Sequence, residues 1–157
     1  MRNCGCSLHY KGSETDLKIL VSACLLGVCC RYDGASKPCP QILKLAERHT
    51  LIPVCPEQLG GISTPRPPAE RRGNCVLTEQ GIDVTQQYQR GAEETLRLYN
   101  LLGCEAAILK ERSPSCGSGE IYDGSFTRTT ICGDGVTAER LKQAGIPVYG
   151  ESQIEQL

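Results

Sequence analysis

Short, unbroken apolar runs recur along the chain, separated by amphipathic or polar segments. Three of them, Ile19–Val21, Leu51–Val54 and Ala106–Leu109, have the length and continuity of strands buried on both faces. Pro53 weakens the second strand or moves it to an end. Ile146–Tyr149 is a fourth candidate. Such runs are typical of the parallel strands of an α/β sheet, so we expect a sheet of this kind.

The segments between these runs have helical periodicity. Apolar positions predict a helix over residues 40–49, with a proline in its first turn. A longer helix can be capped by Asp83 or Thr85 and reaches Leu102, where a glycine follows. A last helix is predicted over Asp134–Ala144, with its aspartate as the cap. Strands and helices therefore alternate, as in βαβ units.

The remaining segments are predicted as turns and loops. Residues 60–73, stiffened by prolines, and residues 111–133 carry no periodic pattern, whereas residues 75–82 resemble a small hairpin. We therefore expect a single three-layer, Rossmann-like α/β domain over residues 18–157, with a mostly parallel sheet and a small added hairpin. Residues 1–17 are polar and unpatterned and are predicted to be a disordered or loosely ordered arm.

Composition narrows the class of protein. The 157 residues suit one domain, and the apolar share of 39% is enough for one core. The 17 Lys and Arg nearly balance 18 Asp and Glu, so we expect no specific nucleic-acid partner. No apolar run suits a membrane helix or a secretory signal, so we expect a cytoplasmic protein with no membrane association. These observations leave the oligomeric state open.

Cysteine is the unusual component, with 11 residues among the 157. In a reducing compartment, abundant cysteine points to metal binding or catalysis before disulfides. Cys24, Cys55 and Cys116 each come after one of the predicted strands. Ligands of open parallel sheets bind beyond the carboxyl ends of the strands. We therefore expect these three cysteines to converge on one edge of the sheet, although they are far apart in the sequence.

Three thiolates can hold zinc or an iron–sulfur cluster. The chain has no Cys-x-x-Cys pair, and the ferredoxin-like opening from Cys24 to Cys29 continues at Tyr32 instead of a cysteine. A site of three thiolates with one open metal position is the arrangement left, and simple packing of the thiols is the alternative. We expect neither His9 nor His49 to be a ligand.

The other cysteines fall into two sets. Cys75, Cys104 and Cys132 are predicted to pack as small apolar side chains. Three more can approach the predicted site but have no required role there: Cys29, Cys30 and Cys39.

Several long, ungapped segments carry a family resemblance. They are Val21–Gly27, Arg31–Gly34, Pro53–Glu57, Thr64–Glu70, Lys110–Gly117, Ile121–Gly124 and Gly133–Ala138. Together they resemble a bacterial domain family whose characterised members are thiouracil desulfidases, and the resemblance covers about residues 18–151. The desulfidases of that family carry a 4Fe-4S cluster held by three cysteines, with the fourth iron free. Matched motif by motif, those ligands fall on Cys24, Cys55 and Cys116.

The resemblance also implies catalytic residues and a reaction. The catalytic carboxylate of the family matches Glu57, and the catalytic hydroxyl matches Ser113, with Ser115 in the same motif as the alternative. By residue type alone, Glu57 also suits a helix cap and Ser113 a turn. The implied activity is hydrolysis of the C=S bond of thiouracil or a related thiolated pyrimidine. The substrate sulfur is expected on the open iron, and the products are the oxo base and hydrogen sulfide.

Other interpretations stay open at this point. A non-enzymatic iron–sulfur or thiol redox sensor would use a second, resolving cysteine, and Cys29 or Cys30 is available. A zinc-bound structural module and a desulfidase for another thio-compound, such as a thiolated nucleoside or nucleotide, are further alternatives. Arg66 and Glu70 either form a structural ion pair or line the pocket.

Overall fold

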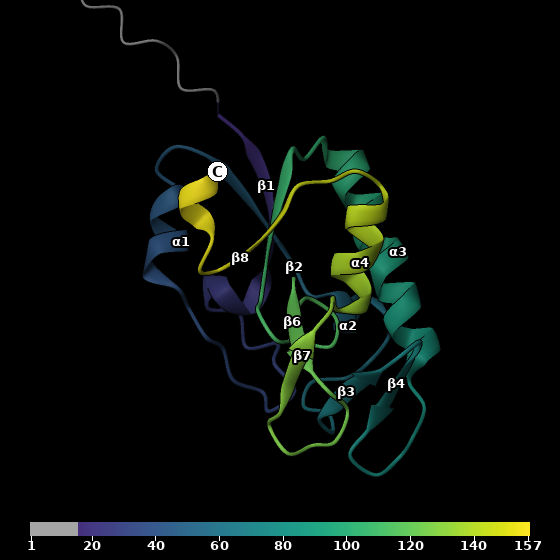
Figure 1. Cartoon of the computed structure of the whole chain (residues 1–157). Helices are drawn as coiled ribbons and strands as arrows, with labels where there is room; N and C mark the ends of the chain where they lie inside the picture. Colours follow the sequence, from purple (N-terminus) through teal and green to yellow (C-terminus); the bar gives the residue numbers. More distant parts are fainter. Residues whose placement is uncertain (1–15) are drawn as a thin grey trace, which may run out of the picture.

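The centre of the molecule is a parallel sheet of four strands in the order β2–β1–β5–β8 (Figure 1). The computed structural model describes residues 16–157, so the expected arm lies almost entirely outside the described residues. The strands are β1 (Lys18–Ser22), β2 (Thr50–Val54), β5 (Ala106–Leu109) and β8 (Val148–Gly150). Each neighbouring pair is parallel. The predicted α/β fold with a parallel sheet is confirmed.

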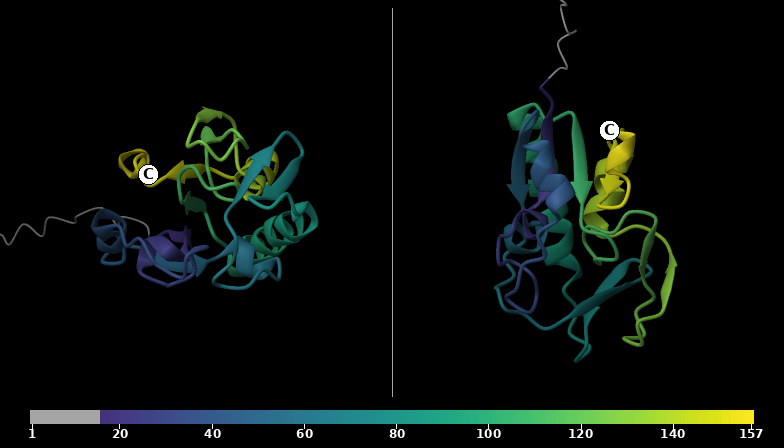
Figure 2. Two further views of the ribbon diagram at one scale, coloured as in Figure 1. Left: turned by 90° about the horizontal axis from the view of Figure 1, so that it is seen from below. Right: turned by 90° about the vertical axis from the view of Figure 1, so that its left-hand side faces the viewer.

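Helices cover both faces of this sheet and make three layers (Figures 1 and 2). One face carries α3 (Thr85–Leu102) and α4 (Val136–Gln143), and the other carries α1 (Pro40–Leu45) with the 3-10 turns η1 (Ala23–Leu26) and η2 (Ile154–Gln156). Because side chains alternate along a strand, Leu20 packs on the first face while Ile19 and Val21 pack on the second. None of the helices in residues 16–157 is long and apolar enough to cross a membrane.

Several element boundaries differ from the sequence-based expectation. The first helix ends at Leu45 and gives way to a turn, where His49 Nδ1 accepts a hydrogen bond from the Leu17 amide (3.3 Å). The last helix begins after Gly135 instead of Asp134, because that aspartate binds other groups, including the Gly119 amide (2.7 Å). β8 starts later than predicted because a proline precedes it and cannot donate to the ladder.

Two antiparallel hairpins lie beyond the carboxyl ends of the sheet strands (Figure 1). β3 (Ala69–Arg72) pairs with β4 (Cys75–Thr78), within a segment that was expected to be loop up to residue 73. The predicted hairpin partner of β4 forms only a single bridge, Leu77 to Asp83. The second hairpin joins β6 (Glu120–Tyr122) and β7 (Thr130–Cys132), so the expectation of a loop without structure over residues 111–133 is wrong.

Three cysteines were predicted to pack as small apolar side chains, namely Cys75, Cys104 and Cys132, and the prediction is correct for Cys104 alone. Cys104 is buried, at the point where the chain enters β5. Cys75 and Cys132 are exposed. Cys75 is the first residue of β4 and Cys132 is the last residue of β7, and both positions are open to solvent.

A short helix, α2 (Pro56–Leu59), connects β2 to the rest of the site and packs closely on α3. Gly60 and Gly91 face the opposing backbones at this contact. A Cβ added at Gly91 would lie 2.8 Å from the carbonyl carbon of Pro56 and closer still to its oxygen, and one at Gly60 would meet the Gln87 carbonyl in the same way. The two glycines therefore allow α2 to rest directly on the α3 backbone, which sets the position of Glu57.

Candidate active site

One cavity of about 520 Å³ opens at the carboxyl edge of the sheet. Its floor comes from the ends of β1, β2 and β5, and its walls come from the two hairpins and the loop over residues 30–37. This is the place where parallel sheets bind ligands. The cavity brings together all three predicted cysteines, both predicted catalytic residues and the previously undecided Arg66 and Glu70.

The three thiols follow three adjacent strands in space. Cys55 follows β2, Cys24 lies just after β1, and Cys116 lies in the loop after β5, so their order matches the strand order. Cys24 is 8% exposed, Cys116 is 6% exposed and Cys55 is half-buried. The backbone amide of Lys110 donates to Ser22 Oγ (2.9 Å), which ties the ends of β5 and β1 together. The predicted convergence is confirmed.

The electrostatic surroundings keep the buried thiols neutral in the metal-free protein. Burial raises the pKa of Cys24, with Lys110 opposing the shift and the neighbouring Cys55 reinforcing it. Burial also raises the pKa of Cys116, against a hydrogen bond from Ser22, and the other two thiols of the set raise it further. Cys55 therefore influences both of the other thiols, as expected of groups that face one space. Binding a metal would displace their protons.

The donor set fits an iron–sulfur cluster by its chemistry, because all three of its members are thiols. Among residues 16–157, no group of three or more His, Cys, Asp or Glu is spaced to hold one metal ion. A cluster presents separate iron atoms to its thiolates, so its ligands stand further apart than the ligands of a single zinc. Three thiols that line one cavity supply the sulfur ligands that such a cluster takes.

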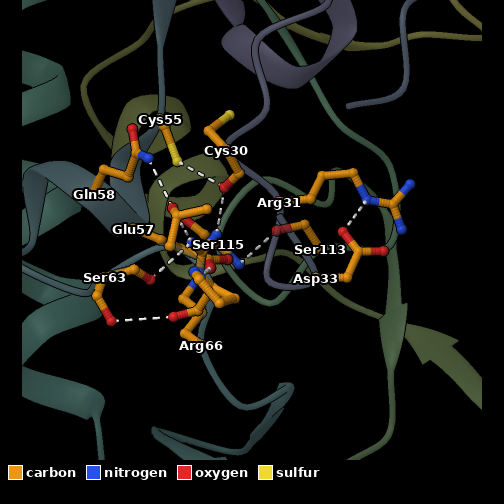
Figure 3. A network of polar contacts seen from close by, with 12 residues as sticks. Cys30, Arg31, Asp33, Cys55, Glu57, Gln58, Ser63, Arg66, Ser113 and Ser115 are labelled. Carbon is orange, nitrogen blue, oxygen red and sulfur yellow. Dashed lines mark hydrogen bonds and ion pairs between the residues drawn. The ribbon is translucent and has the colours of Figure 1, made fainter. Parts of the chain in front are cut away.

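A fourth thiol, Cys30, lies beside this set. It is buried, it lines the same cavity, and its carbonyl oxygen accepts a hydrogen bond from Cys55 Sγ (3.8 Å; Figure 3). Burial, followed by the nearby Cys55 and Cys24, raises the pKa of Cys30 to about 12. The sequence placed Cys30 near the site without a role, and the structure adds that it neighbours Cys55.

Glu57 projects from α2 into the cavity and forms an ion pair with Arg66 (Figure 3). Both side chains are largely buried, so each needs the other to compensate its charge. The Arg66 guanidinium also donates to the Cys30 carbonyl (2.9 Å) and to Thr64 Oγ1 (3.0 Å). The sequence left open whether Arg66 and Glu70 form an ion pair or line the pocket. Both line it, and Arg66 is paired with Glu57 instead of Glu70.

Tyr88 of α3 also belongs to this site. It is 3% exposed, yet it lines the cavity next to Glu57. Burial and then the Glu57 carboxylate raise the pKa of Tyr88 well above its usual range, so its hydroxyl stays protonated. Helical periodicity cannot distinguish a core tyrosine from one whose hydroxyl reaches a site. The position of Tyr88 in the first turn of α3, nearest the sheet edge, was the available signal.

The two candidate serines have different surroundings. Ser113 lines the cavity, and its Oγ accepts hydrogen bonds from the backbone amides of Ser115 (3.1 Å) and Cys116 (3.0 Å). With its oxygen engaged by two donors, its own hydroxyl proton is free to point elsewhere. Ser115 is 1% exposed and shares a buried hydrogen bond with Thr137 Oγ1 (2.9 Å). Ser113 therefore faces the site, and Ser115 fastens the loop to α4.

Charged residues of the loop after β5 are fixed by the C-terminal segment. Lys110 Nζ forms an ion pair with Glu151 (2.6 Å), whose other oxygen accepts from the Glu111 amide (2.6 Å). Arg112 pairs with Glu120 at an exposed position (2.9 Å). Lys110 and Arg112 line the cavity together with Glu111, so this loop contributes charged side chains of both signs to the lining.

Comparisons with known proteins agree with this site. The model of the 2-thiouracil desulfurase family matches residues 19–153. The chain belongs to this family. A solved member, described as a [4Fe-4S]-dependent thiouracil desulfidase, TudS, is 48% identical and has a TM-score of 0.83, covering 90% of this chain and 95% of its own. YbbK of Bacillus subtilis (strain 168), described as uncharacterized, is 45% identical over 149 residues, covering 88% of this chain and 99% of YbbK. The family resemblance read from the sequence is confirmed.

Proposed function

We propose that this 2-thiouracil desulfurase family member is a desulfidase that hydrolyses the C=S bond of thiouracil or a related thiolated pyrimidine, giving the oxo base and hydrogen sulfide. One observation carries the proposal: three thiols from three strand ends line one cavity together with Glu57 and Ser113. The solved relative described as [4Fe-4S]-dependent supports the same assignment, because it shares nearly half of its sequence with this chain.

Cys24, Cys55 and Cys116 would hold a 4Fe-4S cluster, leaving one iron without a protein ligand. When bound, such a cluster supplies an open iron that acts as a soft Lewis acid, to which a thiocarbonyl sulfur can bind. The thiols are preorganised for this role because the three strands that precede them are hydrogen-bonded neighbours in one sheet.

Glu57 is the proposed general base. Its ion pair with Arg66 fixes the direction of the Glu57 side chain, so it can take a proton from the water that attacks the ring carbon. The same group can return the proton to the ring nitrogen or to the departing sulfur. The Tyr88 hydroxyl, kept protonated next to Glu57, is a hydrogen-bond donor in the same part of the cavity. No electron leaves or enters in this net reaction.

Ser113 is proposed to hold the substrate or to relay a proton. Its oxygen is engaged by two backbone amides, which fixes the hydroxyl at the cavity wall and leaves its proton to donate. We assign this role to Ser113 and not to Ser115, because the hydroxyl of Ser115 is buried against Thr137.

The experiment begins with metal content. After anoxic reconstitution, we expect about four iron and four sulfide per chain in the wild type and in Cys104→Ala, whose thiol is buried outside the cavity. Cys24→Ala, Cys55→Ala and Cys116→Ala should each lose most of both. Zinc without sulfide, or iron that survives all three changes, would show that the ligands are misassigned.

Turnover tests the catalytic roles. The reconstituted wild type should release uracil and sulfide from thiouracil, while Glu57→Gln and Ser113→Ala keep their iron and slow by about 10²–10⁴-fold. A Glu57→Gln variant that turns over at the wild-type rate would remove Glu57 from the mechanism. An intact cluster without turnover in the wild type would favour the sensor interpretation.

Basic side chains outnumber acidic ones in the cavity lining, which favours an anionic form of the substrate. Six basic residues (Arg31, Lys37, Arg66, Lys110, Arg112 and Arg128) line the cavity, against four acidic ones (Glu57, Glu70, Glu79 and Glu111). Positive charge around a cavity raises the local concentration of anions. Comparing turnover of the free base, its nucleoside and its monophosphate in the same preparation separates a free-base enzyme from one that acts on a thiolated nucleotide.

A further inference from the structure

The tip of the β6–β7 hairpin forms one wall of the cavity. Residues 123–129 join the two strands, and Phe126 and Arg128 of this tip line the cavity. Phe126 is the single phenylalanine of the chain, which also has no tryptophan. In Figure 2 this hairpin stands beyond the sheet edge, beside the β3–β4 hairpin.

The backbone of this tip adopts a conformation that bulky residues avoid. Phe126 has φ of 58° and Arg128 has φ of 61°. The left-handed region brings Cβ close to the following carbonyl oxygen, so surrounding contacts must maintain it. Such outliers persist where a structure holds them in place, and they concentrate at ligand-contacting positions.

Glu70 supplies the contacts that maintain this left-handed backbone conformation of the hairpin tip. Its Oε2 accepts hydrogen bonds from the backbone amides of Gly124 (2.9 Å) and Phe126 (3.0 Å), and the residue is only 9% exposed. Glu70 belongs to β3, so one hairpin holds the tip of the other. Arg72 of the same strand donates to the Gly124 carbonyl (2.7 Å), and a Cβ at Gly124 would lie 3.1 Å from the Arg72 Cβ.

Phe126 also differs chemically from the other aromatic residues of the cavity. Tyr88 is buried next to Glu57, and the ring of Tyr32 lies under the Arg31 guanidinium (5.8 Å from its centroid). Tyr122 carries a hydroxyl, whereas Phe126 is an apolar ring with no polar atom to satisfy. A flat apolar ring held rigidly at a cavity wall suits contact with a planar heterocycle.

We propose that Phe126 is a substrate-contacting residue that stacks on the thiolated ring, and that Glu70 is the positioning residue that holds Phe126 there. The inference rests on the proposed function and adds a specificity element to the same site. Stacking tolerates changes of ring substituents because every nucleobase has a π-face. Phe126 would therefore select substrates with a planar ring, while other groups in the cavity select substrates that carry the sulfur.

Kinetics give the first test, on the reconstituted enzyme. Phe126→Ala should raise KM about tenfold, the change expected for loss of a stacking contact of about 1.4 kcal/mol, and leave kcat within about threefold. Phe126→Leu keeps apolar volume without the ring and should show the same split if alanine fails to fold. Ile131→Ala is the matched control, because Ile131 is a 47% exposed apolar residue of the same hairpin that does not line the cavity. A KM for Phe126→Leu equal to that of Ile131→Ala would overturn the proposal.

Glu70 is tested through its conservative variant. Glu70→Gln keeps an oxygen that can accept from both amides, so its KM should stay close to the wild-type value. Glu70→Ala should raise KM as Phe126→Ala does. The double change Glu70→Ala with Phe126→Ala should add little, because both act on one contact. Fully additive effects on KM would separate Glu70 from Phe126 and refute the positioning role.

A binding measurement distinguishes failure of this inference from failure of the proposed function. Phe126→Trp introduces the chain's single tryptophan, so its fluorescence reports on the wall alone. Thiouracil should quench it in a saturable manner, and uracil should quench it with comparable affinity in the cluster-free protein. Turnover by the wild type without any quenching would refute the stacking role. Absence of turnover by the wild type would instead refute the desulfidase assignment.

Discussion

Replacing Gly91 by alanine sets two known effects against each other. Gly91 lies inside α3, where alanine is favoured over glycine by about 0.8–1.0 kcal/mol through helix propensity. The new Cβ, however, would stand 2.8 Å from the Pro56 carbonyl carbon, and the Gly60 amide nitrogen is 3.4 Å away. These are backbone atoms of α2, which cannot turn aside as the end of a flexible side chain can.

The clash should dominate. Overpacking commonly costs about 1–3 kcal/mol, and separations under 3.0 Å to backbone lie at the severe end. After the helix-propensity gain is subtracted, we expect a net destabilisation of about 1–2 kcal/mol, which lowers Tm by about 2–8 °C for a domain of this size. Urea unfolding followed by circular dichroism measures the difference.

A matched substitution on the exposed side of the same helix provides the control. Gln89→Ala changes α3 without approaching α2, so its stability should stay within about 0.5 kcal/mol of the wild type. A Gly91→Ala variant as stable as the wild type, or more stable, would refute the reasoning. It would mean that α2 slides away from α3 at no cost and that the glycine contact does not fix the position of Glu57.

Three further outcomes follow from individual side chains. Ser115→Ala removes a buried hydrogen bond and should lower stability by about 1–3 kcal/mol in a urea melt; no loss would mean that the bond is not formed. Cys75 is exposed, whereas burial raises the pKa of Cys104. Iodoacetamide should therefore alkylate Cys75 first, as detected by mass spectrometry, and Cys104 should react at a comparable rate only at more alkaline pH. The pKa of Glu111 is lowered: burial opposes the shift, but hydrogen bonds from Ser152 outweigh it, so its contribution to stability is present at neutral pH and is lost as the pH falls through that pKa. Urea melts of Glu111→Gln should therefore lose less stability on acidification than the wild type, and equal losses would exclude this carboxyl as a contributor.

The elements that the sequence predicted correctly are those with a continuous local pattern of apolar residues. Two strands are buried on both faces, Ile19–Val21 and Ala106–Leu109. Every residue in them is apolar, so the sequence alone identifies them as strands. The convergence of Cys24, Cys55 and Cys116 followed from one topological rule, because each comes after the end of a parallel strand.

The parts that were missed lack such a pattern. β7 (Thr130–Cys132) is exposed along its whole length, so no burial imposes alternation on its residues. Glu70 lies four positions from Arg66, and the sequence left open whether the two residues pair. In the structure Arg66 pairs with Glu57, and Glu70 accepts hydrogen bonds from the backbone of the other hairpin. Partner choice among nearby charges depends on the tertiary path of the chain, which composition and spacing do not encode.

The hydrogen bond from the Lys110 amide to Ser22 joins positions 88 residues apart, and it closes the sheet edge on which the three thiols stand. In small zinc domains, metal binding drives folding because the ligands are close along the chain. Here the donors are separated by most of the domain and meet only after β5 has docked beside β1. On the proposed cluster assignment, folding would therefore come before cofactor insertion. A ribosome-bound chain that has not yet released Cys116 would have no complete ligand set to offer, so whatever delivers iron and sulfide would meet a finished domain.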